Sequence, residues 1–175
     1  MPSFRNSDSE GFGLTVERFV LTALWVISLS VCPAIPKRKR REAWIALLAC
    51  QAMTWVSTML HVWFGLLKFP VREFPKATDL NFTTEFFFYP FLCALYVISE
   101  PKGSGWVRFG HLAVWLTVVS VIDQAIVSFT DLIRYEHYAW YWTWITFGLL
   151  FAVTNAYVRM FFRPAALQSE RRSPP

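Results

Sequence analysis

Three ionisable residues, His61, Glu85 and Asp123, lie inside strongly apolar stretches of the chain. A charged side chain at the centre of a membrane costs about 2.5–3.5 kcal/mol, so residues of this kind are candidates for function by default. Carboxyl and imidazole groups can bind a cation, relay a proton or bind a polar headgroup, and these are the activities that the residue types predict. The alternative is that the three side chains satisfy one another and only fix the packing of helices.

The residue pattern does not predict any other kind of active site. The chain contains no G-x-S-x-G motif, no H-E-x-x-H motif and no phosphate-binding Gly-rich loop. The three cysteines, Cys32, Cys50 and Cys93, have neither CxxC spacing nor a nearby histidine that would complete a metal site. We therefore expect no metal and no cofactor, and no residue can be assigned a catalytic role.

Five apolar runs must position the ionisable residues. Hydrophobic residues make up 55% of the 175 residues, whereas about 45–50% is typical of soluble domains. About 20 apolar residues in a helix cross the hydrocarbon core of a membrane. The sequence therefore predicts an all-α integral membrane protein, a bundle of five transmembrane helices. Their predicted ranges are 14–35, 43–67, 80–99, 106–129 and 140–162.

The basic residues predict the orientation of this bundle. Five of them form a continuous run at positions 37–41, directly before the second apolar run. With the N-terminus outside, 11 of the 17 Lys and Arg residues fall on the inner side, as the positive-inside rule requires. The prediction is N-out/C-in, with four helices if the first run does not span. Residues 14–162 would form a single helical domain between disordered tails at 1–13 and 163–175.

The same topology places the three ionisable residues at one depth. Each lies five or six residues from the predicted outer end of its own helix, which is roughly 8–9 Å below the membrane boundary. The sequence thus predicts an outward-facing polar pocket formed by His61, Glu85, Asp123 and the neighbouring Gln124. The spacing of four polar residues on the second run puts them on one helical face, which predicts a helix–helix interface held by hydrogen bonds. These residues are Gln51, Thr54, Thr58 and His61.

The loop at 68–81 is predicted to cover the pocket. Its prolines disfavour helix and favour an extended, stiff backbone. Its candidate functional residues are Pro70, Arg72, Pro75 and Lys76.

Two further groups of polar residues lie near the last apolar run. The segment 130–139 is polar and aromatic, and is predicted to lie at the membrane surface with Tyr135 and the following Trp140. Near the inner end of the run, Asn155 and Arg159 are spaced i and i+4 and predict a smaller polar pair.

Several of these motifs resemble a known family. They are FPVREFPK at 69–76, EFFFYPF at 85–91 and TDLIRY at 130–135, followed by Trp140 and Thr143. This pattern resembles a family of small multi-pass membrane proteins of Bacillus- and Clostridium-type bacteria whose function is not known. The resemblance covers roughly residues 43–162, with Glu85 where that family tends to have Asp and Asp123 where it tends to have Glu. It implies a bacterial cytoplasmic-membrane protein and supplies no activity.

Three functional hypotheses follow, and the sequence ranks them in this order. The first is a non-enzymatic subunit or partner of a membrane assembly, which would bind another membrane protein or form a homo-oligomer. The second is a small transporter or proton-coupled carrier that uses Glu85, Asp123 and His61. The third is an intramembrane enzyme that acts on lipid. The lipid bilayer is an expected partner in each case, whereas nucleic acid is not, because the chain shows no basic–aromatic binding module.

Overall fold

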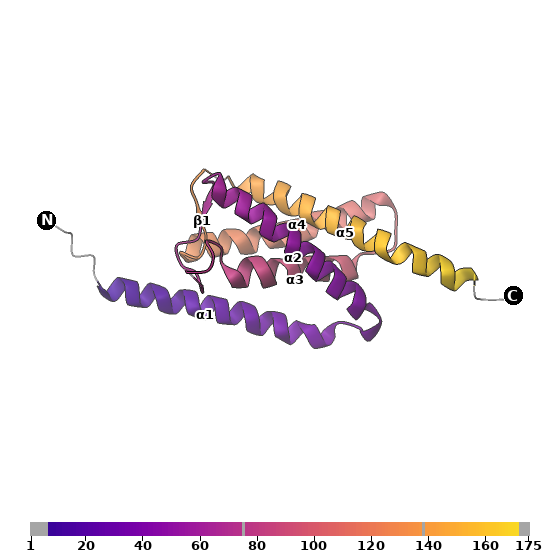
Figure 1. Cartoon of the computed structure of the whole chain (residues 1–175), viewed down its shortest axis with the longest axis horizontal. Helices are drawn as coiled ribbons and strands as arrows, with labels where there is room; N and C mark the ends of the chain where they lie inside the picture. The colour runs from indigo at the N-terminus through magenta and orange to yellow at the C-terminus, as the bar shows by residue number, and fades with distance from the viewer. Residues whose placement is uncertain (1–6, 75, 138, 172–175) are drawn as a thin grey trace.

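The computed structural model describes residues 7–74, 76–137 and 139–171, and side chains within 16–162. It is mostly helical (77%), with five α-helices in the described part of the chain. Figure 1 shows these helices running roughly along one axis. The α-helices are α1 (Ser7–Val31), α2 (Arg40–Trp63), α3 (Tyr89–Ser99), α4 (Gly105–Phe129) and α5 (Trp140–Arg171). Short helical turns, η1 (Cys32–Ala34), η2 (Lys37–Lys39) and η3 (Thr83–Phe88), precede α2 and α3.

Four helical segments are long and apolar enough to cross a membrane. They are Val16–Ala34, Lys37–Trp63, Gly105–Phe129 and Trp140–Phe162. The first apolar run is therefore long and apolar enough to cross a membrane. The sequence had left open a bundle of four helices without this run. The third run is the one that falls short, because its apolar helix is only Thr83–Ser99 and residues 80 and 81 belong to the preceding loop.

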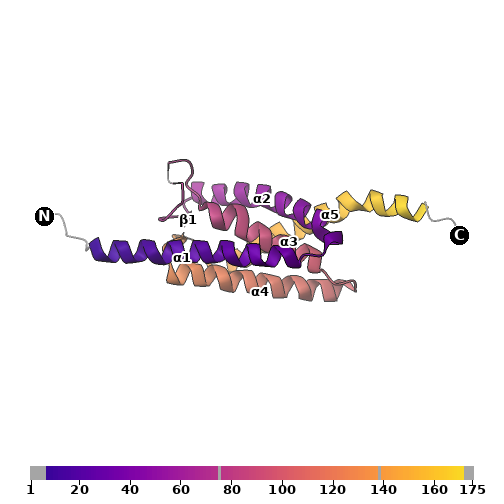
Figure 2. The same ribbon diagram turned by 90° about the horizontal axis from the view of Figure 1, so that it is seen from below.

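Helix α3 lies at the centre of the bundle. It packs most extensively against α2 and also contacts α5 and α4, as Figures 1 and 2 show. Nine of its eleven residues are buried, from Tyr89 to Ala94 and from Tyr96 to Ile98. Helix α1 lies along the side of this group and contacts η3. A helix that is apolar on all sides suits a central position, since no face of it needs solvent.

A π-helical turn, η3, leads into α3 and surrounds Glu85. The N–H of Tyr89 donates to the carbonyl of Thr84, five residues earlier. Pro90 follows in the first turn of α3, directly after the wide turn, and as a proline it has no N–H to donate to that turn. The sequence predicts no such wide turn. Turns of this kind are frequent at functional sites.

Two short strands tie together the loops at one end of the bundle, which we call the sheet end. Strands β1 (Leu67–Lys68) and β2 (Arg134–Tyr135) pair antiparallel, with Leu67 opposite Tyr135. The N–H of Glu136 also donates to the carbonyl of Leu66 at 3.0 Å. The segment predicted to lie at the surface before α5 is therefore bonded to the loop that follows α2. The opposite end, which carries residues 37–41, is called the basic end.

The two terminal helices continue into the segments for which the sequence predicts tails. Helix α1 begins at Ser7 and α5 ends at Arg171. The division into one helical domain and two disordered tails stays a prediction.

The end of α2 generates the first testable prediction. Gly65 follows the last turn of α2 with φ +69°, and its N–H donates to the carbonyl of Val62 at 2.9 Å. A Cβ at this position would meet no atom within 4 Å, so the cost of Gly65→Ala is that of the left-handed backbone, about 1–2 kcal/mol. We expect a corresponding loss in the free energy of unfolding, measured by denaturant titration in micelles.

Gly110→Ala is the matched control. Gly110 lies within α4, and a Cβ there also meets nothing within 4 Å. Because alanine favours a helix interior over glycine, this variant should be as stable as the wild type or more stable. Equal losses in the two variants would contradict the assignment of strain to Gly65.

Candidate functional site

Glu85 and Asp123 line one polar cavity of about 40 Å³ inside the bundle. Each residue is only 5% exposed. The cavity lies between α2, η3, α3, α4 and α5 at the sheet end, and the loops on either side of β1 and β2 close it with Phe69 and Ile133. His61 lines the same cavity. The structure therefore brings together the three ionisable residues that the sequence places at one depth.

Asp123 accepts hydrogen bonds from three hydroxyl groups on three different elements. Tyr89 of α3 donates to Oδ1 at 2.6 Å. Tyr135 of β2 donates to Oδ2, and Thr143 of α5 donates to the same oxygen at 3.3 Å. The hydroxyls of Tyr135 and Thr143 also lie 3.1 Å apart. Hydroxyl donors of this number stabilise a negative charge on the carboxylate, because each presents its positive end to an oxygen.

Glu85 has a sparser polar environment. Thr58 of α2 donates to its Oε2 at 2.6 Å. Its backbone N–H donates to the carbonyl of Asn81, and Asn81 in turn accepts from Thr84 at 3.1 Å. The two carboxyl groups thus share one cavity and differ in how many hydroxyl groups stabilise a charge on them.

The imidazole of His61 is fixed by its own helix. Its Nδ1 lies 2.7 Å from the carbonyl oxygen of Ser57. A carbonyl oxygen only accepts hydrogen bonds, so Nδ1 carries the hydrogen of this bond. His61 therefore lies at the cavity wall with its ring orientation fixed by this bond.

The size of the cavity limits what it can hold. One water molecule needs about 10–15 Å³, so a cavity of about 40 Å³ has room for about three water molecules or a small cation. Sites for organic ligands usually measure about 300–1,000 Å³. A lipid headgroup does not fit. No three His, Cys, Asp or Glu side chains within the described residues are close enough to hold a metal ion.

Gln124 and most of the predicted loop residues lie away from this cavity. Gln124 is exposed and lines a separate groove beside Trp140, because the next residue of a helix is turned by about 100°. Arg72 forms an ion pair with Asp79, which keeps its charge within the loop. Pro70 and Lys76 are exposed, and Pro75 lies outside the described residues.

The loop that covers the cavity contributes apolar side chains instead. Leu67 and Phe69 line it, and Phe69 is buried. Tyr135, predicted to lie at the surface, lines the cavity as well. Trp140 is exposed at the start of α5, outside the cavity.

The polar stripe on α2 differs from the prediction by one residue. Cys50, Thr54 and Thr58 are buried on one face at i+4 spacing, and the Sγ atom of Cys50 lies 3.6 Å from Oγ1 of Thr54. Gln51 lies instead in the groove between α1 and α2. The long amide side chain remains at the edge of the bundle, while the small thiol fills the closely packed contact with α3.

Sequence reasoning missed three residues that hold the carboxyl groups or the loops in place. Tyr89 and Thr143 both donate to Asp123. Tyr89 stands four residues after Glu85, and this spacing was the feature of the sequence that could have identified Tyr89 as a residue of the site. The third is Glu17 of α1, which is buried and accepts a hydrogen bond from the N–H of Asp131 at 3.2 Å.

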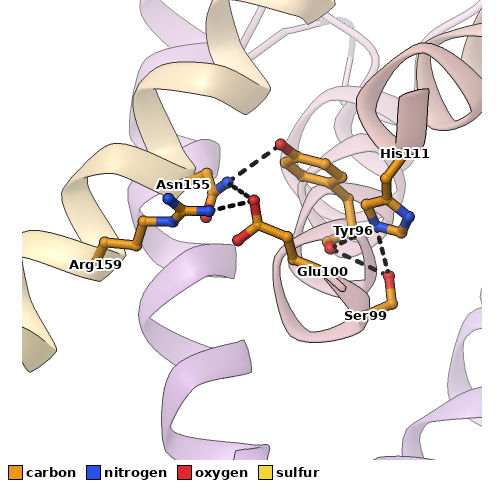
Figure 3. Close-up of polar contacts among 6 residues, drawn as sticks. All are labelled: Tyr96, Ser99, Glu100, His111, Asn155 and Arg159. Atoms are coloured by element: carbon orange, nitrogen blue, oxygen red, sulfur yellow. Dashed lines mark hydrogen bonds and ion pairs between the residues drawn. The ribbon is translucent and has the colours of Figure 1, made fainter. Parts of the chain in front are cut away.

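A second polar cluster lies near the basic end (Figure 3). Asn155 donates to the hydroxyl of Tyr96 at 3.2 Å and to Oε1 of Glu100 at 3.0 Å, and Arg159 forms an ion pair with the same oxygen. The ring of His111 stacks on Tyr96, with centroids 5.5 Å apart. The pair predicted on α5, Asn155 and Arg159, is thus completed by the carboxylate that ends α3.

Comparison of the chain with models of protein families, with curated proteins and with solved structures finds no match. The resemblance to a bacterial membrane-protein family stays a prediction.

Removal of one hydroxyl tests the network around Asp123. Tyr89→Phe leaves the buried Oδ1 atom without its donor, and a buried unsatisfied group costs about 1–3 kcal/mol. We expect a loss of this size in the free energy of unfolding in micelles. Tyr141→Phe is the control, because Tyr141 is 50% exposed on α5 and its substitution should change stability by less than about 0.5 kcal/mol. A loss in Tyr141→Phe as large as that in Tyr89→Phe would contradict this role for the Tyr89 hydroxyl.

The cluster near the basic end predicts a dependence on acid. Burial raises the pKa of Glu100, but the hydrogen bonds from Arg159 and Asn155 and the charge of Arg159 together lower it below its ordinary value. A lowered folded-state pKa stabilises the folded protein above the ordinary value of about 4.3, and this contribution is lost as the pH falls through the lowered value. We expect the wild type to have a higher thermal midpoint than Glu100→Gln at pH 6. The two midpoints should converge towards pH 3.

Asp131→Asn is the control for this titration. Asp131 and Arg134 form an ion pair in which both side chains are more than half exposed, and such pairs contribute little to stability. Its midpoint should follow that of the wild type at every pH. A difference between Glu100→Gln and wild type that stays constant down to pH 3 would contradict the lowered pKa.

Proposed function

We propose that the chain is a multi-pass integral membrane protein, N-out and C-in, and that it acts as a small proton-coupled carrier. Four helical segments with membrane-spanning length and composition support the membrane location. The basic run at 37–41 supports an inner position for the basic end. The resemblance at residues 69–76 and 85–91 supports a bacterial cytoplasmic membrane.

Helix α3 is proposed to complete a bundle of five spans. The segment Thr83–Ser99 has 17 residues and a length of roughly 25 Å, slightly less than a hydrocarbon core of about 30 Å. The surrounding helices carry the large exposed apolar side chains, such as Leu48, Val121 and Leu149. A central helix enclosed by neighbours does not need to match the thickness of the lipid.

The unequal environments of two carboxyl groups in one cavity carry the proposal. The hydroxyls described around Asp123 are those of Tyr89, Tyr135 and Thr143, and the one described at Glu85 is that of Thr58. In the proposed mechanism Asp123 keeps the negative charge, and Glu85 gains and loses the proton. Pairs of acids whose environments differ in this way commonly divide the roles of acid and counter-charge. His61, at the cavity wall, would pass protons between Glu85 and the sheet end.

The proposed carrier is oligomeric. Many carriers are built from two structurally equivalent halves, and a chain of five spans cannot be divided into two equal ones. A homo-oligomer would restore the equivalence, and so would an assembly with a second membrane protein.

A second candidate function is that of a non-enzymatic subunit of a membrane assembly. The observation that favours it is that both oxygens of Asp123 and Oε2 of Glu85 already accept hydrogen bonds from the protein. Buried polar groups that only fix helix packing need this satisfaction. An enzyme acting on lipid headgroups is disfavoured, because the cavity of about 40 Å³ cannot admit them.

Proton uptake into liposomes separates these two functions. We would reconstitute the protein in liposomes loaded with a small cation, the class of solute that the cavity can hold besides water, impose an inward proton gradient, and follow internal pH with a trapped dye. The carrier predicts uptake at least tenfold above that of protein-free liposomes, falling to the protein-free rate in Glu85→Gln, which cannot exchange a proton. Glu73→Gln is the matched control, because Glu73 lies in the loop and accepts from backbone N–H groups outside the cavity.

Wild-type uptake no faster than that of protein-free liposomes would contradict the carrier and favour the subunit. Equal uptake by wild type and Glu85→Gln would contradict the assignment of the proton to Glu85.

A further inference from the structure

A separate apolar groove of about 730 Å³ runs between α1 and α2, over η3 and the first part of α3. We call it the aromatic groove. The polar cavity and the groove share no lining residue. The groove extends from the η1–α2 connection at the basic end to Phe82, before η3. Its walls include Trp25 and Leu29 of α1 and Trp44 and Leu48 of α2.

Stacked rings hold the floor of this groove in place. Trp25 stacks on Phe87, with centroids 4.0 Å apart and planes 12° apart. The Nε1–H group of Trp25 donates to the hydroxyl of Thr83 at 2.9 Å, which fixes the ring against η3. Phe87 in turn stacks near Phe91 at 6.0 Å. The groove is therefore bounded by rings that are held by contacts within the protein.

The basic end of the aromatic groove carries a guanidinium group. Arg40 lines the groove, and its Nε–H donates to the carbonyl of Ile35 at 3.4 Å. This bond uses Nε, so both terminal nitrogens can point to a ligand, and an arginine fork fits the oxygens of a phosphate. The neighbouring basic residues at 37–41 are all exposed. Among the ion pairs of the described residues, none includes a member of this run.

We propose that the aromatic groove binds one anionic phospholipid from the membrane leaflet at the basic end. Its phosphate would contact Arg40, and one acyl chain would lie along the aromatic rings towards η3. The volume of about 730 Å³ lies in the range of small-molecule sites. Basic pockets between transmembrane helices at this level of a membrane suit acidic headgroups.

The charge of the basic end argues against a second copy of the chain in this groove. Two copies joined along this face would bring two runs of five basic residues together, and like charges repel at such an interface. An anionic headgroup has the opposite effect, because it neutralises the run.

Native mass spectrometry of the purified protein tests the proposal. We would titrate the protein in micelles with phosphatidylglycerol or with phosphatidylcholine of the same acyl chains. We expect one retained phosphatidylglycerol molecule per chain and at least fivefold weaker retention of phosphatidylcholine. Arg40→Gln should weaken the retention of phosphatidylglycerol by about fivefold, which corresponds to about 1 kcal/mol for one basic residue.

Two pairs of variants separate this site from general attraction. Arg41→Gln removes the same charge from a residue that does not line the groove, and should change retention by less than twofold. Leu48→Trp fills the groove from a position that is 58% exposed, whereas Leu60→Trp alters a position on the same helix that is 49% exposed and outside the groove. Leu48→Trp should reduce lipid retention at least fivefold, and Leu60→Trp should not.

Equal retention of the two phospholipids would overturn the proposal, as would equal effects within either pair of variants. Co-purification of a protein chain that Leu48→Trp releases would also overturn it, by showing a protein in the groove. Glu85→Gln should retain phosphatidylglycerol like the wild type. This result separates the lipid site from the proton site. The proposal of proton transport could then fail without affecting the proposal of lipid binding.

Discussion

The carboxylate of Asp123 joins four segments of the bundle. Its side chain lies on α4 and accepts hydrogen bonds from α3, β2 and α5 through Tyr89, Tyr135 and Thr143. A buried carboxylate without these partners would be strongly destabilising. The three hydroxyl groups reach the carboxylate only when the helices and the paired strands are arranged as they are in the structure. The requirement to satisfy one buried acid therefore fixes the arrangement of three helices and a loop.

The sequence predicts the long helices well and the central element poorly. The apolar runs that give α2, α4 and α5 are long enough to be recognised from composition alone. The third run is also apolar, but composition does not show where its helix begins. A π-helical turn at Thr83–Phe88 depends on bonds between residues five apart, and no residue type signals this spacing. The pairing of β1 with β2 joins distant loops by backbone bonds, and side-chain patterns barely record it.

The candidate site shows the same limit at the level of single residues. The helical rise places His61, Glu85 and Asp123 at one level, and all three line the cavity. The sequence defines the rotation of each helix less precisely than its depth. A shift of one residue accounts for the wrong placement of Gln124 in the cavity. A shift of one residue also accounts for Gln51 being predicted on the stripe of α2 where the structure has Cys50. Tyr89 was missed because a tyrosine in an aromatic-rich apolar run looks like a membrane-boundary residue. The acceptor for its hydroxyl lies 34 positions further along the chain.

Tyr135 belongs to two structures at once, since its backbone pairs with Leu67 in the two-stranded sheet and its hydroxyl donates to Asp123. Movement of this sheet away from the bundle would remove one of the donors that hold the charge on Asp123. The hydrogen bonding of Asp123 and the position of the covering loops are consequently linked. Linkage of this kind is reciprocal: whatever neutralises Asp123 loosens the covering loops, and whatever lifts the loops makes Asp123 easier to neutralise. In the proposed mechanism, in which Asp123 keeps its negative charge, the phenol of Tyr135 couples that charge to the position of the covering loops.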